Sequence, residues 1–107
     1  MTTEEYEMIV MELITNAGQA KSEYMQAIRF AKIGDFDNAA QSLDEGRKFL
    51  NFAHEVQTKL IGLDQGEGKV KVTLVMVHAQ DHLMNAVLMK ELASEFVEIY
   101  KKLPSEK

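Results

Sequence analysis

Cysteine and tryptophan are absent from the 107 residues, and proline occurs once. Without cysteine the chain has no disulfide framework, no thiolate metal site and no thiol nucleophile, which fits a cytoplasmic protein. One proline and six glycines favour helices over a turn-rich β architecture. No stretch reaches the roughly 18 uninterrupted apolar residues of a membrane span, and the acidic start MTTEEYEMIV does not resemble a secretory signal.

The chain also has no excess of basic residues. Twelve Lys and Arg against seventeen Asp and Glu give a net charge of −5, whereas a protein that binds nucleic acid usually presents a basic face. We therefore expect no nucleic-acid partner and no membrane insertion. The length is that of a single domain, which we place at residues 1–107.

Apolar and small residues recur at steps of three and four along most of the chain, as they do on one face of an α-helix. Thr2 and Glu5 have the spacing of a capping box, Gly34 is a plausible helix stop, and Asp35 or Asp37 can cap a second helix. The sequence therefore predicts an all-α fold, an antiparallel three-helix bundle. The predicted helices cover about residues 3–33, 36–63 and 70–103.

Two details of this pattern have more than one interpretation. Gly46 interrupts the second apolar run, and it either allows a close approach between helices or is a weak point costing ~1 kcal/mol relative to Ala. The third segment is apolar nearly all round, with thirteen apolar residues among the twenty from Val70 to Met89. Another copy of the chain is the simplest cover for that surplus surface, and long Lys and Glu side chains are the alternative.

His78, Asp81 and His82 are set into this apolar run at positions i, i+3 and i+4, which share one face of a helix. They are open to three interpretations. The first is a purely structural polar stripe, in which core histidines are hydrogen-bonded to Asp81 and to carbonyl groups. The second is a metal site with two imidazoles and a carboxylate, although Ala79 stands where H-E-x-x-H has its general base.

The third interpretation is a nucleophilic histidine. An imidazole needs one exposed nitrogen and one held by a hydrogen bond, and Gln80 or a protonated His82 can donate to phosphoryl oxygens. Apolar neighbours such as Val77 and Leu83 would keep water from hydrolysing a phosphohistidine. No Gly-rich phosphate loop of P-loop spacing is present, which argues against direct use of a nucleotide.

The segment VHAQDHLM, together with HEVQTKL, GEGKVKV and the turn AKIGDFDNAA, resembles the enzyme IIA component of the lactose/cellobiose family. This family belongs to the bacterial phosphoenolpyruvate-dependent sugar phosphotransferase system. The resemblance implies a cytoplasmic phosphocarrier in which three bundles form a nine-helix homotrimer. It implies that Nε2 of His78 accepts a phosphoryl group from the carrier HPr and passes it to a cysteine of enzyme IIB, for a disaccharide of the cellobiose or chitobiose type rather than lactose.

The resemblance also implies a metal centre. Three copies of Asp81 would meet near the threefold axis and share one Mg²⁺ or another divalent cation per trimer, which agrees with the repulsion expected among three carboxylates. Gln80 and His82 would support His78. His54 and Gln57 match a further family pattern, H-x-x-Q-T, although a hydrogen-bonded histidine between helices is the favoured explanation of His54. The runner-up function is a helical metal-binding or scaffold module with a structural His and Asp core.

Overall fold

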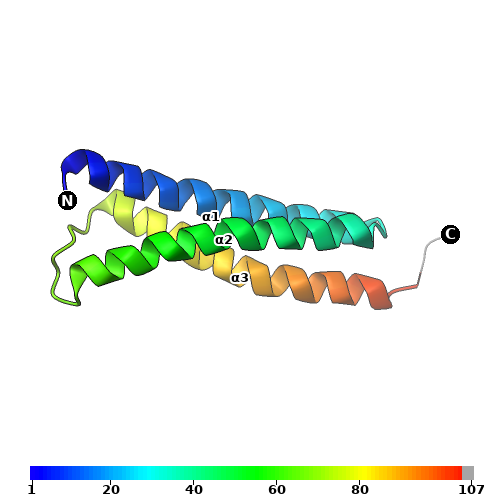
Figure 1. The fold of residues 1–107 in the computed structure, drawn as a ribbon. Helices are drawn as coiled ribbons and strands as arrows, with labels where there is room; N and C mark the ends of the chain where they lie inside the picture. Colours follow the sequence, from blue (N-terminus) through cyan, green and yellow to red (C-terminus); the bar gives the residue numbers. More distant parts are fainter. Residues whose placement is uncertain (105–107) are drawn as a thin grey trace.

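The computed structural model describes residues 1–104, which form three long helices arranged up, down and up (Figure 1). Thr3–Lys32 is α1, Phe36–Asp64 is α2 and Leu74–Lys102 is α3. The bundle is a rod with extents of 58 × 22 × 19 Å. The predicted antiparallel three-helix bundle is confirmed, and its first two helices agree with prediction to within one residue at each end.

The predicted N-terminal caps of α1 and α2 are both present. The hydroxyl oxygen of Thr2 accepts a hydrogen bond from the backbone N–H of Glu5 at 3.1 Å, and Asp35 Oδ1 accepts one from the N–H of Asn38 at 3.2 Å. Gly34 has φ +81°, a conformation that L side chains rarely adopt, and it follows Ile33, the C-cap residue of α1. A tight turn of three residues therefore reverses the chain between α1 and α2.

The predicted start of the third helix at Val70 is wrong, because α3 begins at Leu74. Thr73 is the N-cap, and its hydroxyl oxygen accepts from the N–H of Met76 at 3.2 Å. The preceding residues are held by partners elsewhere. Asp64 Oδ1 accepts from the N–H of Val70 at 2.9 Å, and the Tyr6 hydroxyl donates to the carbonyl oxygen of Lys71 at 2.7 Å. The bond from Tyr6 occupies the carbonyl group of Lys71, which in a helix from Val70 would accept from the N–H of Val75.

Helix α1 forms the centre of the bundle, since it packs along both α2 and α3 while those two meet over a shorter stretch. Its buried face is rich in alanine, and small side chains let neighbouring helices approach closely. Gly46 of α2 lies against the ring of Tyr24, where an added Cβ would be 2.6 Å from Cε1. The close-approach interpretation of Gly46 is therefore confirmed. The buried residues of α1 are Val10, Leu13, Ala17, Ala20, Tyr24, Ala27 and Ala31.

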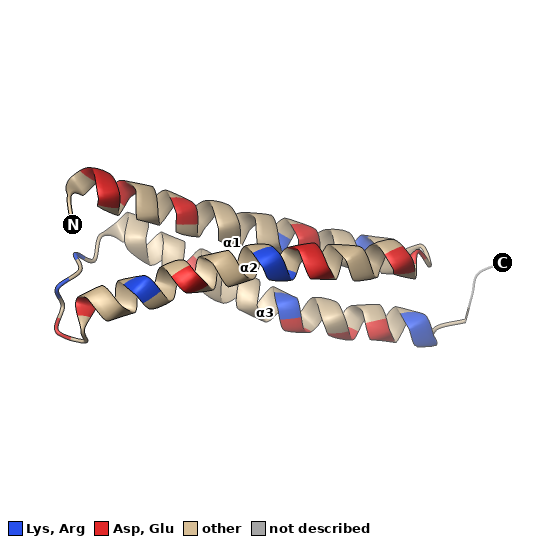
Figure 2. Cartoon of the chain, viewed as in Figure 1, with Lys and Arg blue, Asp and Glu red and all other residues tan. Residues whose placement is uncertain are grey.

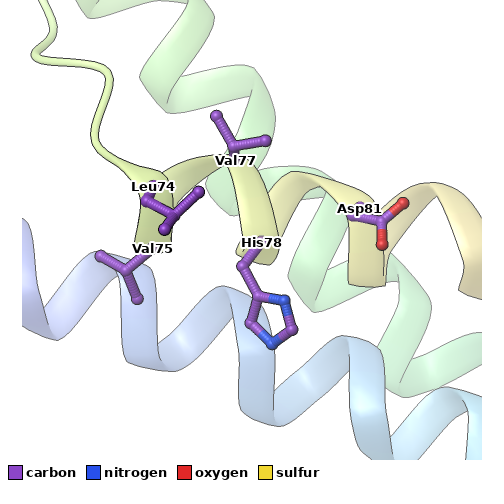
Figure 3. A pocket seen from close by; sticks show the side chains of 5 residues that line it. All are labelled: Leu74, Val75, Val77, His78 and Asp81. Atoms are coloured by element: carbon purple, nitrogen blue, oxygen red, sulfur yellow. The ribbon is translucent and has the colours of Figure 1, made fainter.

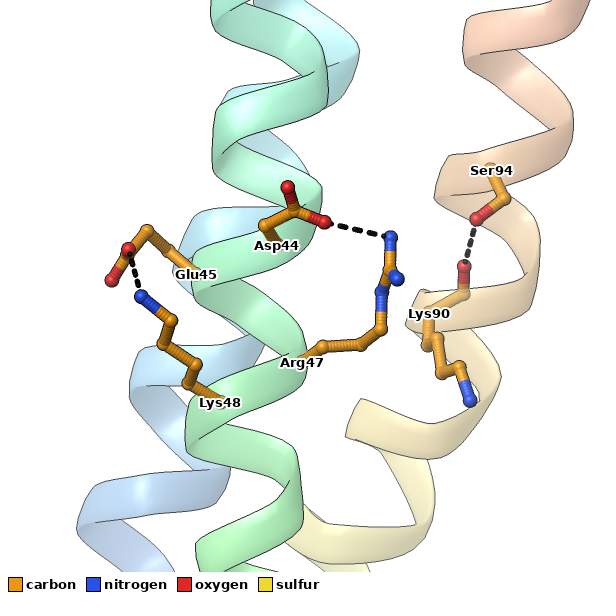
Figure 4. A network of polar contacts seen from close by, with 6 residues as sticks. All are labelled: Asp44, Glu45, Arg47, Lys48, Lys90 and Ser94. Carbon is orange, nitrogen blue, oxygen red and sulfur yellow. Dashed lines mark hydrogen bonds and ion pairs between the residues drawn. The ribbon is translucent and has the colours of Figure 1, made fainter.

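Charged residues are unevenly distributed over the three helices (Figure 2). On α2, exposed ion pairs one turn apart join Arg47 to Asp44 at 3.1 Å and Lys48 to Glu45 at 2.9 Å (Figure 4). Exposed pairs of this kind contribute only about 0.3–0.5 kcal/mol each. The first sixteen residues of α3, 74–89, contain a single Asp or Glu and no Lys or Arg. That half of α3 therefore presents a nearly uncharged surface.

Candidate functional site

A line of exposed, mostly apolar side chains follows α3 on the side facing away from the other helices. We name it the α3 stripe, and it consists of Leu74, Val77, Asp81, Met84 and Leu88. Its steps of three and four residues repeat every seven, which is the spacing of a coiled-coil seam. The apolar members are between 50% and 86% exposed, so Lys and Glu side chains of residues 1–104 do not cover them. Asp81 is the one polar member.

The N-terminal part of the α3 stripe borders an open, largely apolar pocket of about 700 Å³. Leu74, Val75, Val77, His78 and Asp81 line it, all from the first two turns and a half of α3 (Figure 3). His78 and Asp81 are exposed in the single chain. The expectation of a buried polar stripe with core histidines is therefore wrong for the isolated chain. The residues lie at its surface, because α3 has a second apolar face that no other helix of the chain covers.

The two histidines contact each other directly. His78 Nε2 and His82 Nε2 are 3.1 Å apart, and the rings meet edge to face at an interplanar angle of 85°. The shared helix face that the i, i+4 spacing predicts is confirmed. Neither ring is hydrogen-bonded to Asp81 or to a carbonyl group among residues 1–104. His78 is thus exposed beside the pocket, and its Nε2 faces Nε2 of His82.

Lys21 of α1 is a member of the site that the sequence motif did not reveal. Its Nζ lies 3.1 Å from Nδ1 of His82, across 61 residues of sequence. Partial burial lowers the pKa of the His82 imidazole, and the nearby Lys21 and His78 lower it further, while Asp81 acts in the opposite direction. The balance favours a neutral His82. A lysine on α1 carries no sequence signal of this contact, since it depends on how α1 and α3 are aligned.

Gln80 and His54 lie away from the histidine pair. Gln80 faces α2, where its Oε1 accepts from Nε2 of Gln57 at 2.7 Å. This bond connects Gln57, a residue of the H-x-x-Q-T pattern, to the motif on α3. His54 is exposed on α2 and has no side-chain hydrogen bond to any described residue. Among residues 1–104, then, His82 contacts His78 and Lys21 contacts His82, whereas Gln80 is bonded to Gln57.

Asp81 is exposed and makes no hydrogen bond or ion pair with the rest of residues 1–104. Its carboxylate points away from the His78 ring (Figure 3). No group of three or more His, Asp or Glu side chains in the described part of the chain is placed to hold a metal ion. The hypothesis of a metal held by His78, Asp81 and His82 of one chain has no support in this geometry. The free carboxylate oxygens of Asp81 remain suited to a hard cation that several chains share.

The family model for the lactose/cellobiose-specific IIA subunit of the phosphotransferase system matches residues 8–101. The match covers all three helices and the whole site. The chain belongs to this IIA family. The predicted family is thereby confirmed, and the alternative of an unrelated scaffold or metal-binding module is set aside.

Individual relatives agree with this assignment. The N,N'-diacetylchitobiose-specific EIIA component of Escherichia coli K12 is 55% identical over 100 residues, which are 94% of this chain and 86% of that protein. The lichenan-specific enzyme IIA component of Bacillus subtilis is 42% identical over 97% of this chain and 94% of its own length. A lactose-specific EIIA component from Staphylococcus epidermidis is 33% identical over 95% and 98%.

Solved structures of IIA proteins have the same fold. The cellobiose-specific enzyme IIA of Bacillus anthracis superposes with a TM-score of 0.90 at 42% identity, covering 100% of this chain and 96% of that one. The chitobiose IIA protein of E. coli, in its complex with HPr, gives a TM-score of 0.80 at 52% identity over 94% and 97%. As for the IIA chain itself, none of the helices within residues 1–104 is long and apolar enough to cross a membrane.

Proposed function

We propose that this IIA subunit is a cytoplasmic phosphocarrier whose His78 takes a phosphoryl group from phospho-HPr and passes it to a cysteine of enzyme IIB. The observation that carries the proposal is the exposed side chain of His78 beside an apolar pocket, with its Nε2 3.1 Å from Nε2 of His82. A relative of 52% identity is described in complex with HPr, which supports HPr as the donor. The partners are thus a donor carrier and an acceptor subunit, and no nucleotide is required.

The transfer is an in-line displacement at phosphorus. The lone pair of His78 Nε2 forms the new N–P bond, while the bond from phosphorus to the donor breaks and its electron pair stays with the donor. Such transition states are loose, so the site acts mainly by positioning and by stabilising charge on the phosphoryl oxygens. An N–H of His82 is within reach of those oxygens. In the second transfer a thiolate of IIB attacks phosphorus, and the electron pair returns to Nε2.

The surface around His78 suits two successive partners. The pocket walls are the side chains of Leu74, Val75 and Val77, and the next charged residue along α3 after Asp81 is Lys90. Apolar contacts, including the soft side chain of Met84, adapt to differently shaped partners. They also exclude water, which would otherwise hydrolyse the phosphohistidine. Because both partners must reach Nε2 of the same ring, HPr and IIB exclude each other.

We further propose that three chains associate through the α3 stripe into a nine-helix homotrimer. Four members of the stripe are apolar and at least half exposed, and their seven-residue repeat is that of a coiled-coil seam. Asp81 occupies one position of that seam. Three such carboxylates near an axis would repel one another, and one Mg²⁺ or a similar divalent cation per trimer would neutralise them.

The sugar class follows from relatives rather than from the site. The chitobiose-specific relative is 55% identical to this chain, whereas the lactose-specific one is 33% identical. We therefore propose a disaccharide of the chitobiose or cellobiose type over lactose. Uptake and phosphorylation of that sugar would belong to the membrane component and IIB.

The relay is tested by incubating the chain with phosphoenolpyruvate, enzyme I and HPr and measuring its intact mass. The wild type should gain one phosphoryl group, about 80 Da by the mass of HPO₃, and His78→Ala should gain none because the nucleophile is gone. His54→Ala is the matched control, since it removes an exposed histidine of α2 and should leave the adduct unchanged. An adduct that persists in His78→Ala would reject His78 as the acceptor.

The proposed metal centre has an independent test. Elemental analysis of the purified protein should find one magnesium-like ion per three chains, and the ion should be lost in Asp81→Asn. Stoichiometric zinc in every chain, lost in His82→Ala instead, would favour a site built on the two histidines and contradict the role of Asp81.

A further inference from the structure

Lys21 has an unusual environment for a lysine of this protein. It is half-buried on α1, and its Nζ contacts Nδ1 of His82 at 3.1 Å. No carboxylate among residues 1–104 lies within ion-pair distance of it, whereas Lys48, Lys69 and Lys101 each pair with a nearby glutamate. The ammonium group of Lys21 is therefore directed at an imidazole rather than at an acid. This contact determines which nitrogen of the His82 ring carries the proton.

An ammonium group carries hydrogen-bond donors and no acceptor. At this contact Nδ1 of His82 must then be the acceptor, so it carries no proton. The proton of the neutral His82 ring lies on Nε2, the atom that faces Nε2 of His78 at 3.1 Å. His82 Nε2 donates and His78 Nε2 accepts. The neutral His78 ring consequently keeps its proton on Nδ1 and its lone pair on Nε2, the nitrogen that attacks phosphorus.

We propose that Lys21 is a positioning residue of the phosphoryl relay, which holds the tautomers of His82 and His78 through one chain of hydrogen bonds. This role rests on the proposed function of His78. Before transfer, the N–H of His82 points at the attacking lone pair and orients the His78 ring. When the N–P bond forms, that lone pair is consumed, and a small ring rotation lets the same N–H donate to a phosphoryl oxygen. No proton has to be gained or lost by His82 in this exchange.

The tautomers are measured by ¹⁵N NMR of the ring nitrogens in the unphosphorylated, full-length protein. In the wild type, His82 should show a protonated Nε2 and a bare Nδ1. Lys21→Met keeps the length of the side chain and removes its donors, so the His82 signals should move toward a mixture of tautomers. Lys21→Arg restores a donor-only cation and should restore the wild-type pattern. Lys32→Met, an exposed change near the end of the same helix, is the control and should leave both histidines unchanged.

Transfer from phospho-HPr supplies the second measurement. For Lys21→Met the single-turnover rate at saturating phospho-HPr should fall about tenfold, the loss expected for one misdirected hydrogen bond in the transition state. The HPr concentration that gives half the maximal rate should stay the same, because Lys21 is not needed for docking. Lys21→Arg should recover most of the rate. A thermal melt of each variant checks that the bundle is intact.

The outcomes separate this role from the relay itself. If wild-type His78 takes up phosphorus while Lys21→Met keeps both the tautomers and the rate, the role of Lys21 is overturned and the relay stands. If Lys21→Met only lowers the melting temperature, the lysine is structural and the role is likewise overturned. If the wild type never forms a phosphohistidine, the proposed function fails, and the role of Lys21 in transfer falls with it.

Discussion

Tyr24 is the largest side chain that the bundle buries completely, and its hydroxyl group has no hydrogen-bond partner among the described residues. Burial raises the pKa of this phenol above its usual value, although the positive charge of Arg47 acts in the opposite direction. An unpaired buried hydroxyl destabilises the folded state because it has lost its hydrogen bonds to water. Tyr24 thus stabilises the bundle through its buried ring and not through its hydroxyl group.

Tyr24→Phe should therefore raise the free energy of unfolding by about 1 kcal/mol at neutral pH. The substitution should also change how the free energy of unfolding depends on pH in alkaline solution. Above pH 10, roughly the pKa of an unfolded tyrosine, the folded wild type holds the Tyr24 proton more tightly than the unfolded chain does, so stability falls with rising pH. The variant lacks that contribution to the slope. Urea unfolding at neutral pH and at pH above 10 measures both effects.

Tyr6→Phe is the matched control, because the Tyr6 hydroxyl contacts the Lys71 carbonyl oxygen at 2.7 Å and the Thr73 hydroxyl at 2.9 Å. Losing those bonds should lower stability by about 1 kcal/mol. Equal losses from both tyrosine variants would contradict the account of Tyr24. Neither role was predictable from the sequence, since each depends on atoms contributed by another segment.

At the scale of the helix, Gly46 and Gly62 of α2 differ in what surrounds them. A Cβ at Gly46 would lie 2.6 Å from Cε1 and 2.9 Å from Cδ1 of the Tyr24 ring, whereas a Cβ at Gly62 would meet nothing within 4 Å. Helix propensity alone favours alanine over glycine at both positions by up to about 1 kcal/mol. Only at Gly46 does packing against α1 oppose that preference.

Gly46→Ala should consequently lower the free energy of unfolding by about 1–3 kcal/mol, the usual range for overpacking, because the buried ring cannot move aside freely. Gly62→Ala should leave stability unchanged or raise it. Thermal or urea unfolding of the two variants, monitored by far-ultraviolet circular dichroism, gives the comparison. Gains of similar size in both variants would mean that α1 and α2 can separate at no cost.

The helices themselves were largely predictable, because their signals are local. Apolar residues at steps of three and four, together with the caps at Thr2 and Asp35, predict the bounds of α1 and α2 to within one residue. The predicted start of α3 at Val70 is four residues too early. Thr73 is a good N-cap residue ahead of the apolar run, and KVKVT alternates as extended chains do, so the signal was present. Val70 and Val72 continue the apolar run, which extends the predicted helix past that cap.

At the scale of the whole molecule, the α3 stripe is the surface through which we propose that three chains associate. Asp81→Leu should give a trimer that persists without divalent cations, because a leucine in the seam removes the repulsion among three carboxylates. Sedimentation or light scattering with and without a chelator measures this. The wild-type trimer should weaken when the cation is removed, and the variant should not respond.

Leu88→Lys is the companion variant, since Leu88 is 54% exposed and belongs to the apolar part of the α3 stripe. Three lysines in the seam should dissociate the assembly whether or not a cation is present. If Asp81→Leu also fell apart to monomers, Asp81 would contribute more than a charge that the cation compensates. The proposed arrangement at the axis would then be wrong.

The sequence by itself determined the three helices, their order and the histidine motif, because helical periodicity, capping and an i, i+4 pair depend on residues a few positions apart. It also predicted that α3 has more apolar surface than one bundle can bury. Only the tertiary structure brought Lys21 to His82, turned Gln80 toward Gln57 and seated the Tyr24 ring on Gly46. Those contacts depend on how each helix is rotated and shifted along its neighbour, and that alignment is settled by the packing of side chains far apart in the chain.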